Sequence, residues 1–448
     1  MLRLALPLVM AELGWMFMGV VDTIMVGHLP QPAVTISAVA LGQVLYNTIG
    51  FGIGGVLLGL DTYISQAHGA GEWEAANRWL LHGVVLSVML SAILMGIVWV
   101  GPIAMVRLPA DREVLEQAIA FLNTLNWGTV PLFLYLVFRR YLQAFNHVRP
   151  IAAAVVSANL VNAGLDWLLL FGHRWEIGGH VLAIKSYGVV GSAVSTALAR
   201  LYLAVFVGVA VWWLDRRHKY GLAGAERTLD WDRLMRLVKL GAPIGGQIFV
   251  EISIFAAVTA LIGTLGPVPL AGHEIALNCV AFTFMVPFAI SAAATVRVGQ
   301  AVGRGSPMDA RASGWTAISL GAGFMLCMAV LIVTIPTTIA RWFTHDVGVV
   351  GAAVPLLIVG AAFQFFDGVQ VTATGALRGV GITKPGLAAQ VMGYWVIGFP
   401  VGLWLGFAKK WGATGLWTGL ACGLMAAAVG LMLVWVRALR RGVGARTV

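Results

Sequence analysis

Several carboxylic acids of this sequence stand inside runs of apolar residues. In the stretch GQIFVEISIFAAVTALIG, which ends at Gly263, Glu251 is the single charged residue. An ionised carboxylate at the centre of a bilayer costs about 2.5 to 3.5 kcal/mol, so such residues are kept where a cation, a polar cavity or a hydrogen-bond partner stabilises them. The acids that lie in or near apolar runs are Glu12, Asp22, Asp61, Asp166, Glu251, Glu274 and Asp367.

In the first half of the chain, four polar residues share one expected depth. Counted from the ends of their apolar runs at 1.5 Å per helical residue, they lie roughly 8 to 14 Å below the same surface. They are Asp22, Asn162, Asp166 and Thr196. Asn162 and Asp166 are four residues apart and share one helix face. We expect either an oxygen cage for a small cation such as Na⁺, or a relay in which the two acids share a proton.

A second polar group is expected in the other half. Glu251 and Asp367 fall near the middle of their apolar runs, with Gln247 one helical turn from Glu251 and Asn278 in the outer half of another run. An acidic pair that faces a cleft would attract organic cations, and binding a proton would remove that attraction. We therefore expect coupling of substrate and cation here, with Na⁺ held by Glu251 and Asp367 as one alternative.

The remaining acids are expected to have other roles. Glu12 lies one turn after Pro7, where we expect it to satisfy backbone groups freed by the proline. Asp61 is near the end of an apolar run, where interfacial water can solvate it. Glu274 has a similar position.

Motifs for enzymatic chemistry are absent from the sequence. There is no GxxxxGK[ST] phosphate loop, no HExxH and no nucleophile elbow with a histidine partner. Cys279, Cys327 and Cys422 are isolated, so neither a disulfide framework nor a CxxC metal site is available. We expect no enzyme and no cofactor.

The composition requires a membrane protein that crosses the bilayer many times. Of the 448 residues, 59% are hydrophobic and 11% charged, and the mean hydropathy is +0.88. Soluble proteins carry about 25% charged residues. The apolar runs predict an all-α fold with twelve transmembrane helices near residues 4–27, 37–66, 76–101, 113–146, 150–171, 187–214, 233–264, 270–302, 310–340, 349–379, 385–407 and 413–436.

The distribution of positive charge predicts the orientation of the chain. Of the 29 Lys and Arg residues, 21 fall on the side of the termini and seven on the opposite side, with Arg200 inside a span. By the positive-inside rule, both termini are cytoplasmic. The net charge of +10 does not indicate nucleic acid, because no basic soluble domain holds it. No cleavable signal peptide is expected, and a longer native N-terminus stays open.

An internal repeat divides the chain into two halves. Leu4-Ala-Leu-Pro7 recurs as Leu240-Gly-Ala-Pro243 at an offset of 236 residues, and Gln66-Ala-His-Gly69 recurs as Gln300-Ala-Val-Gly303 at an offset of 234. Each half holds six spans, so both enter the membrane in the same direction. We expect an N-lobe over 1–214, a cytoplasmic linker over 215–232 and a C-lobe over 233–448, with the two six-helix lobes around a central cleft.

The motifs of several spans together resemble one transporter family. They are Phe17-Met-Gly-Val-Val-Asp22, Asn162-Ala-Gly-Leu-Asp166-Trp, Val250-Glu251, His273-Glu-Ile-Ala-Leu-Asn278, Asp367-Gly-Val-Gln-Val and Gly375-Ala-Leu-Arg-Gly379. Over essentially its whole length, the chain is similar to the multidrug and toxic compound extrusion (MATE) transporters, in particular the bacterial NorM-like branch. Phe365 departs from this pattern, because some members have a tyrosine there.

This resemblance implies a secondary active efflux transporter. It implies cation-coupled export of cationic or amphipathic drugs by alternating access. The N-lobe cation or proton site would be formed by Asp22, Asn162, Asp166 and Thr196, and the C-lobe coupling and substrate site by Glu251, Asp367, Asn278 and Gln247. Whether the coupling ion is Na⁺ or H⁺ stays open.

The expected setting is the bacterial cytoplasmic membrane, and a monomer is expected because one chain holds both lobes. The alternatives are a flippase for a lipid-linked precursor, a major facilitator transporter and an intramembrane enzyme. The flippase would need basic groups in its cleft, whereas Arg200 is the one clear mid-span base.

Overall fold

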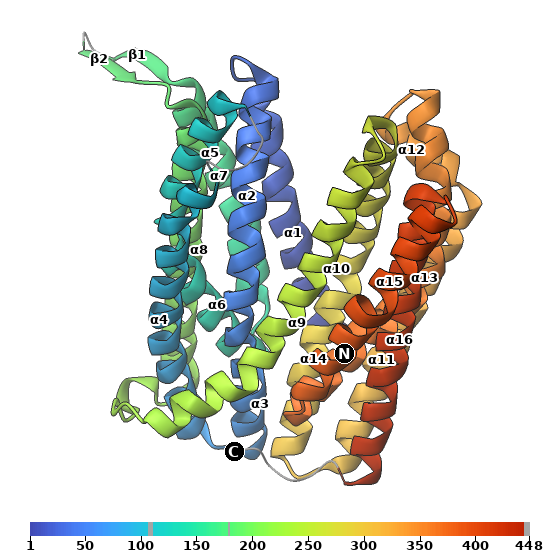
Figure 1. The fold of residues 1–448 in the computed structure, drawn as a ribbon. Coiled ribbons are helices and arrows are strands. Elements are labelled where there is room, and N and C mark those ends of the chain that lie inside the picture. The colour runs from blue at the N-terminus through green and yellow to red at the C-terminus, as the bar shows by residue number, and fades with distance from the viewer. Residues whose placement is uncertain (106–110, 178–179, 443–448) are drawn as a thin grey trace. The chain divides into compact units, whose positions relative to one another are not determined.

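The computed structural model describes residues 1–105, 111–177 and 180–442, and nearly all of them are helical (Figure 1). Within this part of the chain, eleven helices or helix runs are long and apolar enough to cross a membrane, and a bent pair makes a twelfth. The prediction of an all-α protein with twelve spans is confirmed. Apolar runs of this length form helices because every backbone polar group must find its partner inside the segment when no water is present.

The helices follow one another along the chain with short connections. Those of the first half are α1 (Leu2–Val26), α2 (Pro32–Gly54), the 3₁₀ segment η1 (Gly55–Leu58), α3 (Gly59–Ala70), α4 (Trp73–Met105), α5 (Arg112–Asn126), α6 (Thr129–Ala144), α7 (Arg149–Phe171) and α8 (Gly188–His218). The short 3₁₀ segment η2 (Leu222–Gly224) precedes the second half.

The second half is formed by the elements that follow η2. They are α9 (Trp231–Gly263), α10 (Pro267–Gly303), α11 (Pro307–Thr334), α12 (Pro336–Phe343), α13 (Val347–Val380), α14 (Lys384–Gln390), the π-helical η3 (Val391–Gly398), α15 (Phe399–Leu403), the π-helical η4 (Trp404–Ala408) and α16 (Gly412–Arg440). The segment from α14 to η4 is one membrane span.

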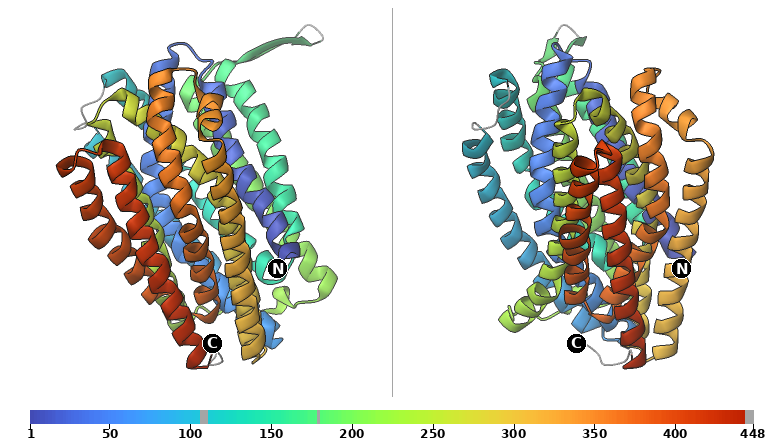
Figure 2. Two further views of the ribbon diagram at one scale, coloured as in Figure 1. Left: turned by 90° about the vertical axis from the view of Figure 1, so that its right-hand side faces the viewer. Right: turned by 45° about the vertical axis from the view of Figure 1, so that its right-hand side comes forward.

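Two features of the helices differ from the sequence-based expectation. The span expected over 310–340 is interrupted at Ile335, and Pro336 starts the separate helix α12. Proline has no N–H to donate to the preceding turn, so the helix breaks there. In addition, β1 (His173–Ile177) and β2 (His180–Ile184) pair antiparallel, with His173 opposite Ile184, and project beyond the ends of α7 and α8 (Figures 1 and 2).

The chain packs into two compact units. Unit 1 contains Met1–Val9, Asp61–Glu72 and the chain from Arg236 on, and unit 2 contains Met10–Leu60 and Trp73–Met235. Most of α3 therefore packs with helices of the second half. The Thr62 hydroxyl donates to the Arg378 carbonyl at 2.7 Å, and the Gln66 amide donates to the Gly379 carbonyl at 3.0 Å.

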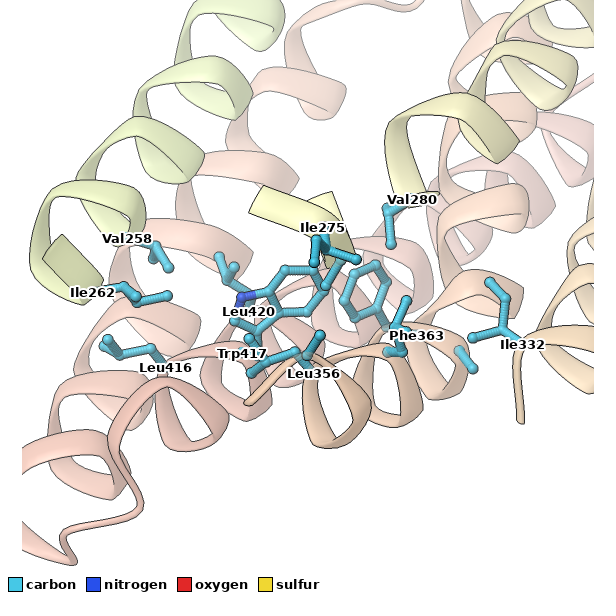
Figure 3. Close-up of a cluster of buried hydrophobic side chains, with 14 of the residues drawn as sticks. Val258, Ile262, Ile275, Val280, Ile332, Leu356, Phe363, Leu416, Trp417 and Leu420 are labelled. Carbon is cyan, nitrogen blue, oxygen red and sulfur yellow. The ribbon is translucent and has the colours of Figure 1, made fainter. Parts of the chain in front are cut away.

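Unit 1 has an aromatic core around Trp417. This indole is fully buried among side chains of α9, α10, α13 and α16, as Figure 3 shows. Its N–H donates to Nδ1 of His273 at 2.9 Å, and Nε2 of His273 lies 2.8 Å from the Thr259 hydroxyl. Each buried polar atom of this triad is thereby paired, as a low-dielectric interior requires. The triad connects α9, α10 and α16.

In unit 2, Glu12 has a different partner from the one expected. Its carboxylate forms an ion pair with the Arg139 guanidinium of α6, and both side chains are about nine-tenths buried or more. The expectation that Glu12 satisfies the backbone near Pro7 is therefore replaced by an interhelical ion pair. The sequence could not indicate it because the two residues are far apart along the chain.

The polar segment between the halves, residues 215–232, packs against other parts of unit 2. The Asn77 side chain donates to the Tyr220 carbonyl at 2.8 Å, and the Asp230 backbone N–H donates to Nε2 of His82 at 2.9 Å. Nε2 of His147 lies 3.2 Å from the Tyr220 hydroxyl. These contacts hold the segment from both of its ends.

Candidate functional site

The first polar group lies between three helices of unit 2. Asp22 is near the end of α1, Asn162 and Asp166 lie one turn apart on α7, and Thr196 is on α8. Helices α7 and α8 pack closely because Gly191 has no side chain: a Cβ there would lie 2.6 Å from the Leu169 carbonyl oxygen. This close approach brings the polar faces of the two helices together.

Hydrogen bonds connect all four predicted residues. The Asn162 amide nitrogen donates to the Asp22 carboxylate and, at 3.0 Å, to Oδ2 of Asp166. The Thr196 hydroxyl lies 3.4 Å from Oδ2 of Asp22. Asp22, Asn162 and Asp166 are each at most 2% exposed. One amide thus bridges two acids that would otherwise repel each other.

Several buried oxygen atoms on α7 and α8 have no hydrogen-bond partner among the described residues. They include Oδ1 of Asn162, Oδ1 of Asp166 and Oγ of Ser192. Buried oxygen atoms normally have one. A small hard cation such as Na⁺ or a proton on a carboxylate would satisfy them, because all are oxygen acceptors. We call Asp22, Asn162, Asp166, Ser192 and Thr196 the Asp22 site.

The second polar group lies in unit 1. Glu251 is on α9, Asp367 on α13, Gln390 at the end of α14 and Tyr394 in η3. The Gln390 amide lies 3.4 Å from Oε2 of Glu251. The charge of Glu251 acts on Asp367, and the charges of both acids act on the Tyr394 hydroxyl. We call these four residues the Glu251 site.

This site also contains buried polar atoms without a partner. Within the described chain they are the Tyr394 hydroxyl and Oε1 of Gln390. Next to the site, both polar side-chain atoms of Gln364, one helical turn before Asp367, also have no partner among the described residues. Tyr394 is 1% exposed and Asp367 4%. Unsatisfied polar groups beside two acids offer hydrogen-bond donors and acceptors to a bound cation or substrate.

Two residues predicted for this site are placed elsewhere by the structure. The Gln247 amide donates to the Thr383 carbonyl at 3.0 Å, and its oxygen accepts from Arg378 at 3.4 Å. Gln247 thus supports the turn between α13 and α14. Asn278 is exposed, and its amide donates to the Glu274 carbonyl of its own helix at 2.8 Å.

Sequence reasoning missed Ser192, Gln390 and Tyr394. A signal existed for the first, since Ser192 and Thr196 are spaced four apart and face the same side of α8. Gln390 and Tyr394 show the same spacing in their span. The missing information was which neighbouring helix each polar face meets.

The side chains at both sites are of the type that can bind small cations reversibly. Each site has two carboxylates and neutral oxygen or amide groups. In the part of the chain that is described, no group of three or more His, Cys, Asp or Glu residues could hold a metal ion, so a site of the zinc type is not formed there. Acid pairs with amide and hydroxyl oxygen suit a proton or an alkali cation.

Comparison with known proteins identifies the family of the chain. The family model described as MatE matches twice, at residues 7–168 and 243–404. The two matches are displaced by 236 residues, which is the offset of the first repeat motif. One family unit is therefore present in two copies.

Relatives of similar length cover almost the whole chain. A protein of Mesorhizobium japonicum named "Probable multidrug resistance protein NorM" is 31% identical over 97% of this chain and 93% of its own. The "Multidrug resistance protein PmpM" of Pseudomonas aeruginosa is 31% identical over 98% of this chain and 91% of its own.

Solved structures share the fold. The eukaryotic MATE transporter AtDTX14 superposes with a TM-score of 0.87 at 20% identity, over 98% of this chain and 96% of that one. A transporter of the MOP superfamily from Pyrococcus furiosus gives a TM-score of 0.84 at 19% identity, over 98% and 96% of the two chains. At this identity, the likeness concerns the fold.

Proposed function

Because the chain belongs to the MatE family and is a membrane transporter rather than an enzyme, we propose that it exports cationic or amphipathic drugs in exchange for Na⁺ or H⁺. The observation that carries this proposal is the pair of acid sites, one in each unit, whose three aspartates are buried and whose Glu251 is half-buried. The names of the relatives in Mesorhizobium japonicum and Pseudomonas aeruginosa, both multidrug resistance proteins, support drugs as the substrate. A lipid-linked substrate would need basic groups, whereas both sites are built around acids.

The Asp22 site is the proposed entry point of the driving cation. An inward-moving charge releases about 2.3 kcal/mol per 100 mV of membrane potential. Binding of the cation satisfies the unpaired oxygen atoms of Asn162, Asp166 and Ser192, and this changes the packing of α7 against α8. The N-lobe residues Asp22, Asn162, Asp166 and Thr196 thus carry cation coupling in this proposal.

The Glu251 site is the proposed place where substrate and cation compete. An ionised Glu251 or Asp367 attracts a cationic drug, and a proton or Na⁺ bound there removes the attraction and releases the drug. Alternating access then exposes the sites to each side of the membrane in turn. In this proposal Gln247 supports the turn between α13 and α14, and Asn278 is an exposed polar residue of α10 that a substrate can contact.

The proposal includes the membrane, the orientation of the chain and its division into lobes. The charge distribution supports cytoplasmic termini and a bacterial cytoplasmic membrane. The two copies of the family unit support an N-lobe over 1–214 and a C-lobe over 233–448, joined by the linker 215–232, and a monomer that holds both lobes.

The test is efflux from proteoliposomes with an imposed Na⁺ or H⁺ gradient and ethidium as the drug. One gradient should drive efflux and the other should not. Asp22→Asn should abolish dependence on that gradient, and Glu251→Gln and Asp367→Asn should abolish efflux at unchanged expression. The exposed N-cap variant Asp346→Asn serves as control. Efflux that persists at the wild-type rate in all three site variants would contradict the proposal.

A further inference from the structure

Arg200 is a buried basic residue within a membrane-spanning helix. It lies on α8, four residues after Thr196, so the two side chains share a helix face about 6 Å apart along the axis. Arg200 is only 5% exposed. A guanidinium in such a place is costly unless its charge is balanced.

Arg200 is held in place mainly by apolar and aromatic contacts. Its guanidinium carbon lies 4.7 Å from the centre of the Tyr46 ring of α2. Its aliphatic stem passes beside Gly128, where a Cβ would lie 3.1 Å from Cδ of Arg200. Gly128 is in the break between α5 and α6, which meet at 48°. The break therefore leaves the space through which the side chain reaches Tyr46.

A hydrogen-bonded chain fixes the Tyr46 ring under the guanidinium. The Tyr46 hydroxyl lies 2.8 Å from the Thr129 hydroxyl, which lies 3.2 Å from Oδ1 of Asn126. The Asn126 amide donates to the Met95 carbonyl at 3.1 Å. A ring with fixed orientation keeps its negative face toward the cation.

Arg200 forms no direct ion pair with any residue that the structure describes. Within the described residues, its Nε and Nη1 atoms are buried and have no hydrogen-bond partner. Thr196, one helical turn before Arg200, has its hydroxyl 3.4 Å from Oδ2 of Asp22, and the positive charge of Arg200 acts on that carboxylate along with its hydrogen-bond partners. Since arginine keeps its proton in proteins, this positive charge is permanent.

We infer that Arg200 is a positioning residue that sets how tightly the Asp22 site holds its cation, a conclusion that rests on the proposed function. Two ionised carboxylates and one guanidinium leave a net charge of minus one, which one monovalent cation neutralises. Without Arg200, the same cation meets two negative charges in a medium of low dielectric constant and is held more tightly. Arg200 thus keeps the site weak enough to release its cation in every cycle.

The test compares the cation concentration that gives half-maximal ethidium efflux in proteoliposomes. Arg200→Gln should lower this concentration at least about tenfold and reduce the maximal rate, because cation release becomes slow. Arg200→Lys keeps the charge and should stay within about threefold of the wild type. The control Arg112→Gln removes a positive charge from an exposed position of the same unit and should change neither value.

Folding and function are separated by two further measurements. Thermal unfolding of each purified variant reports whether it is folded. If Arg200→Gln does not fold, the cation dependence of Arg200→Lys alone tests the inference. A wild-type cation dependence in folded Arg200→Gln, or a tenfold shift in folded Arg200→Lys, would overturn the inference. The proposed function fails separately, when Asp22→Asn keeps the wild-type dependence on the gradient.

Discussion

Gly69 of α3 lies directly on the main chain of Gln300 of α10, with no room for a Cβ between them. The contact is reciprocal, because Gly303 lies in the same way on the main chain of Gln66. Residues 66 and 69 correspond to 300 and 303 in the internal repeat. The two copies of one motif therefore pack against each other within unit 1, each supplying the glycine that the other requires.

Gly69→Ala is expected to destabilise unit 1. The added methyl group overlaps the Gln300 carbonyl group, and moving backbone apart in a packed interior typically costs about 1 to 3 kcal/mol. Thermal unfolding in detergent measures the effect. Gly96→Ala is the control, since no described atom within 4 Å opposes a Cβ at Gly96 in α4. Equal unfolding temperatures of the two variants would show that the α3–α10 contact is not tight.

Ser192→Ala should weaken cation binding at the Asp22 site. It removes an oxygen atom that has no partner among the described residues, and the loss of one hydrogen-bond or ligand contact of about 1 kcal/mol corresponds to about fivefold. The measurement is the cation concentration for half-maximal efflux, which should rise. Ser87→Ala is the matched control, because the Ser87 hydroxyl donates to the Val84 carbonyl within α4. A shift of the same size in both variants would point to a general effect on packing.

Tyr394→Phe should impair efflux without lowering stability. The Tyr394 hydroxyl is buried with no hydrogen-bond partner in the described chain, so its removal relieves an unsatisfied group while taking a polar group away from the surroundings of Glu251 and Asp367. Tyr141→Phe is expected to lower stability without impairing efflux. The Tyr141 hydroxyl donates to Asn77 at 2.7 Å, and neither residue belongs to the Asp22 site or the Glu251 site. Efflux and thermal unfolding are measured on both. Normal efflux by Tyr394→Phe would remove Tyr394 from the Glu251 site.

Acidification should loosen the segment that joins the two halves. Burial, and secondly the positive charge of His218, lower the pKa of His147 below its ordinary value of about 6.5. A released His147 therefore binds a proton at a higher pH than the docked one does. The contribution of His147 to docking is fully present above about pH 6.5 and decreases as the pH falls through the lowered pKa.

Hydrogen exchange over residues 219–230 at pH 7.5 and 5.5, corrected for intrinsic rates, measures this effect. Exchange should be faster at the lower pH in the wild type, and His147→Gln should remove the difference. His345→Gln, at an exposed position, should leave it unchanged. A wild-type pH dependence in His147→Gln would assign the effect to another group.

The sequence by itself determined the class of the fold and the depth of the polar residues. Apolar runs must be helical in a bilayer, and the rise per residue is constant, so twelve spans and the common depth of Asp22, Asn162, Asp166 and Thr196 could be obtained from residue positions alone. The repeat offset was also readable, because two copies of one motif keep their order.

Only the tertiary structure decided which helix faces meet. Rotation of a helix about its axis is set by packing against neighbours, which hydropathy does not encode. For this reason the sequence could not predict three interactions: the hydrogen bond of Gln247 to the Thr383 carbonyl, the ion pair of Glu12 with Arg139, and the effect of the Glu251 charge on Tyr394. The same holds for Arg200, which is far from Asp22 in the sequence. Only the packing of α1, α2, α7 and α8 brings the two charges close enough to interact.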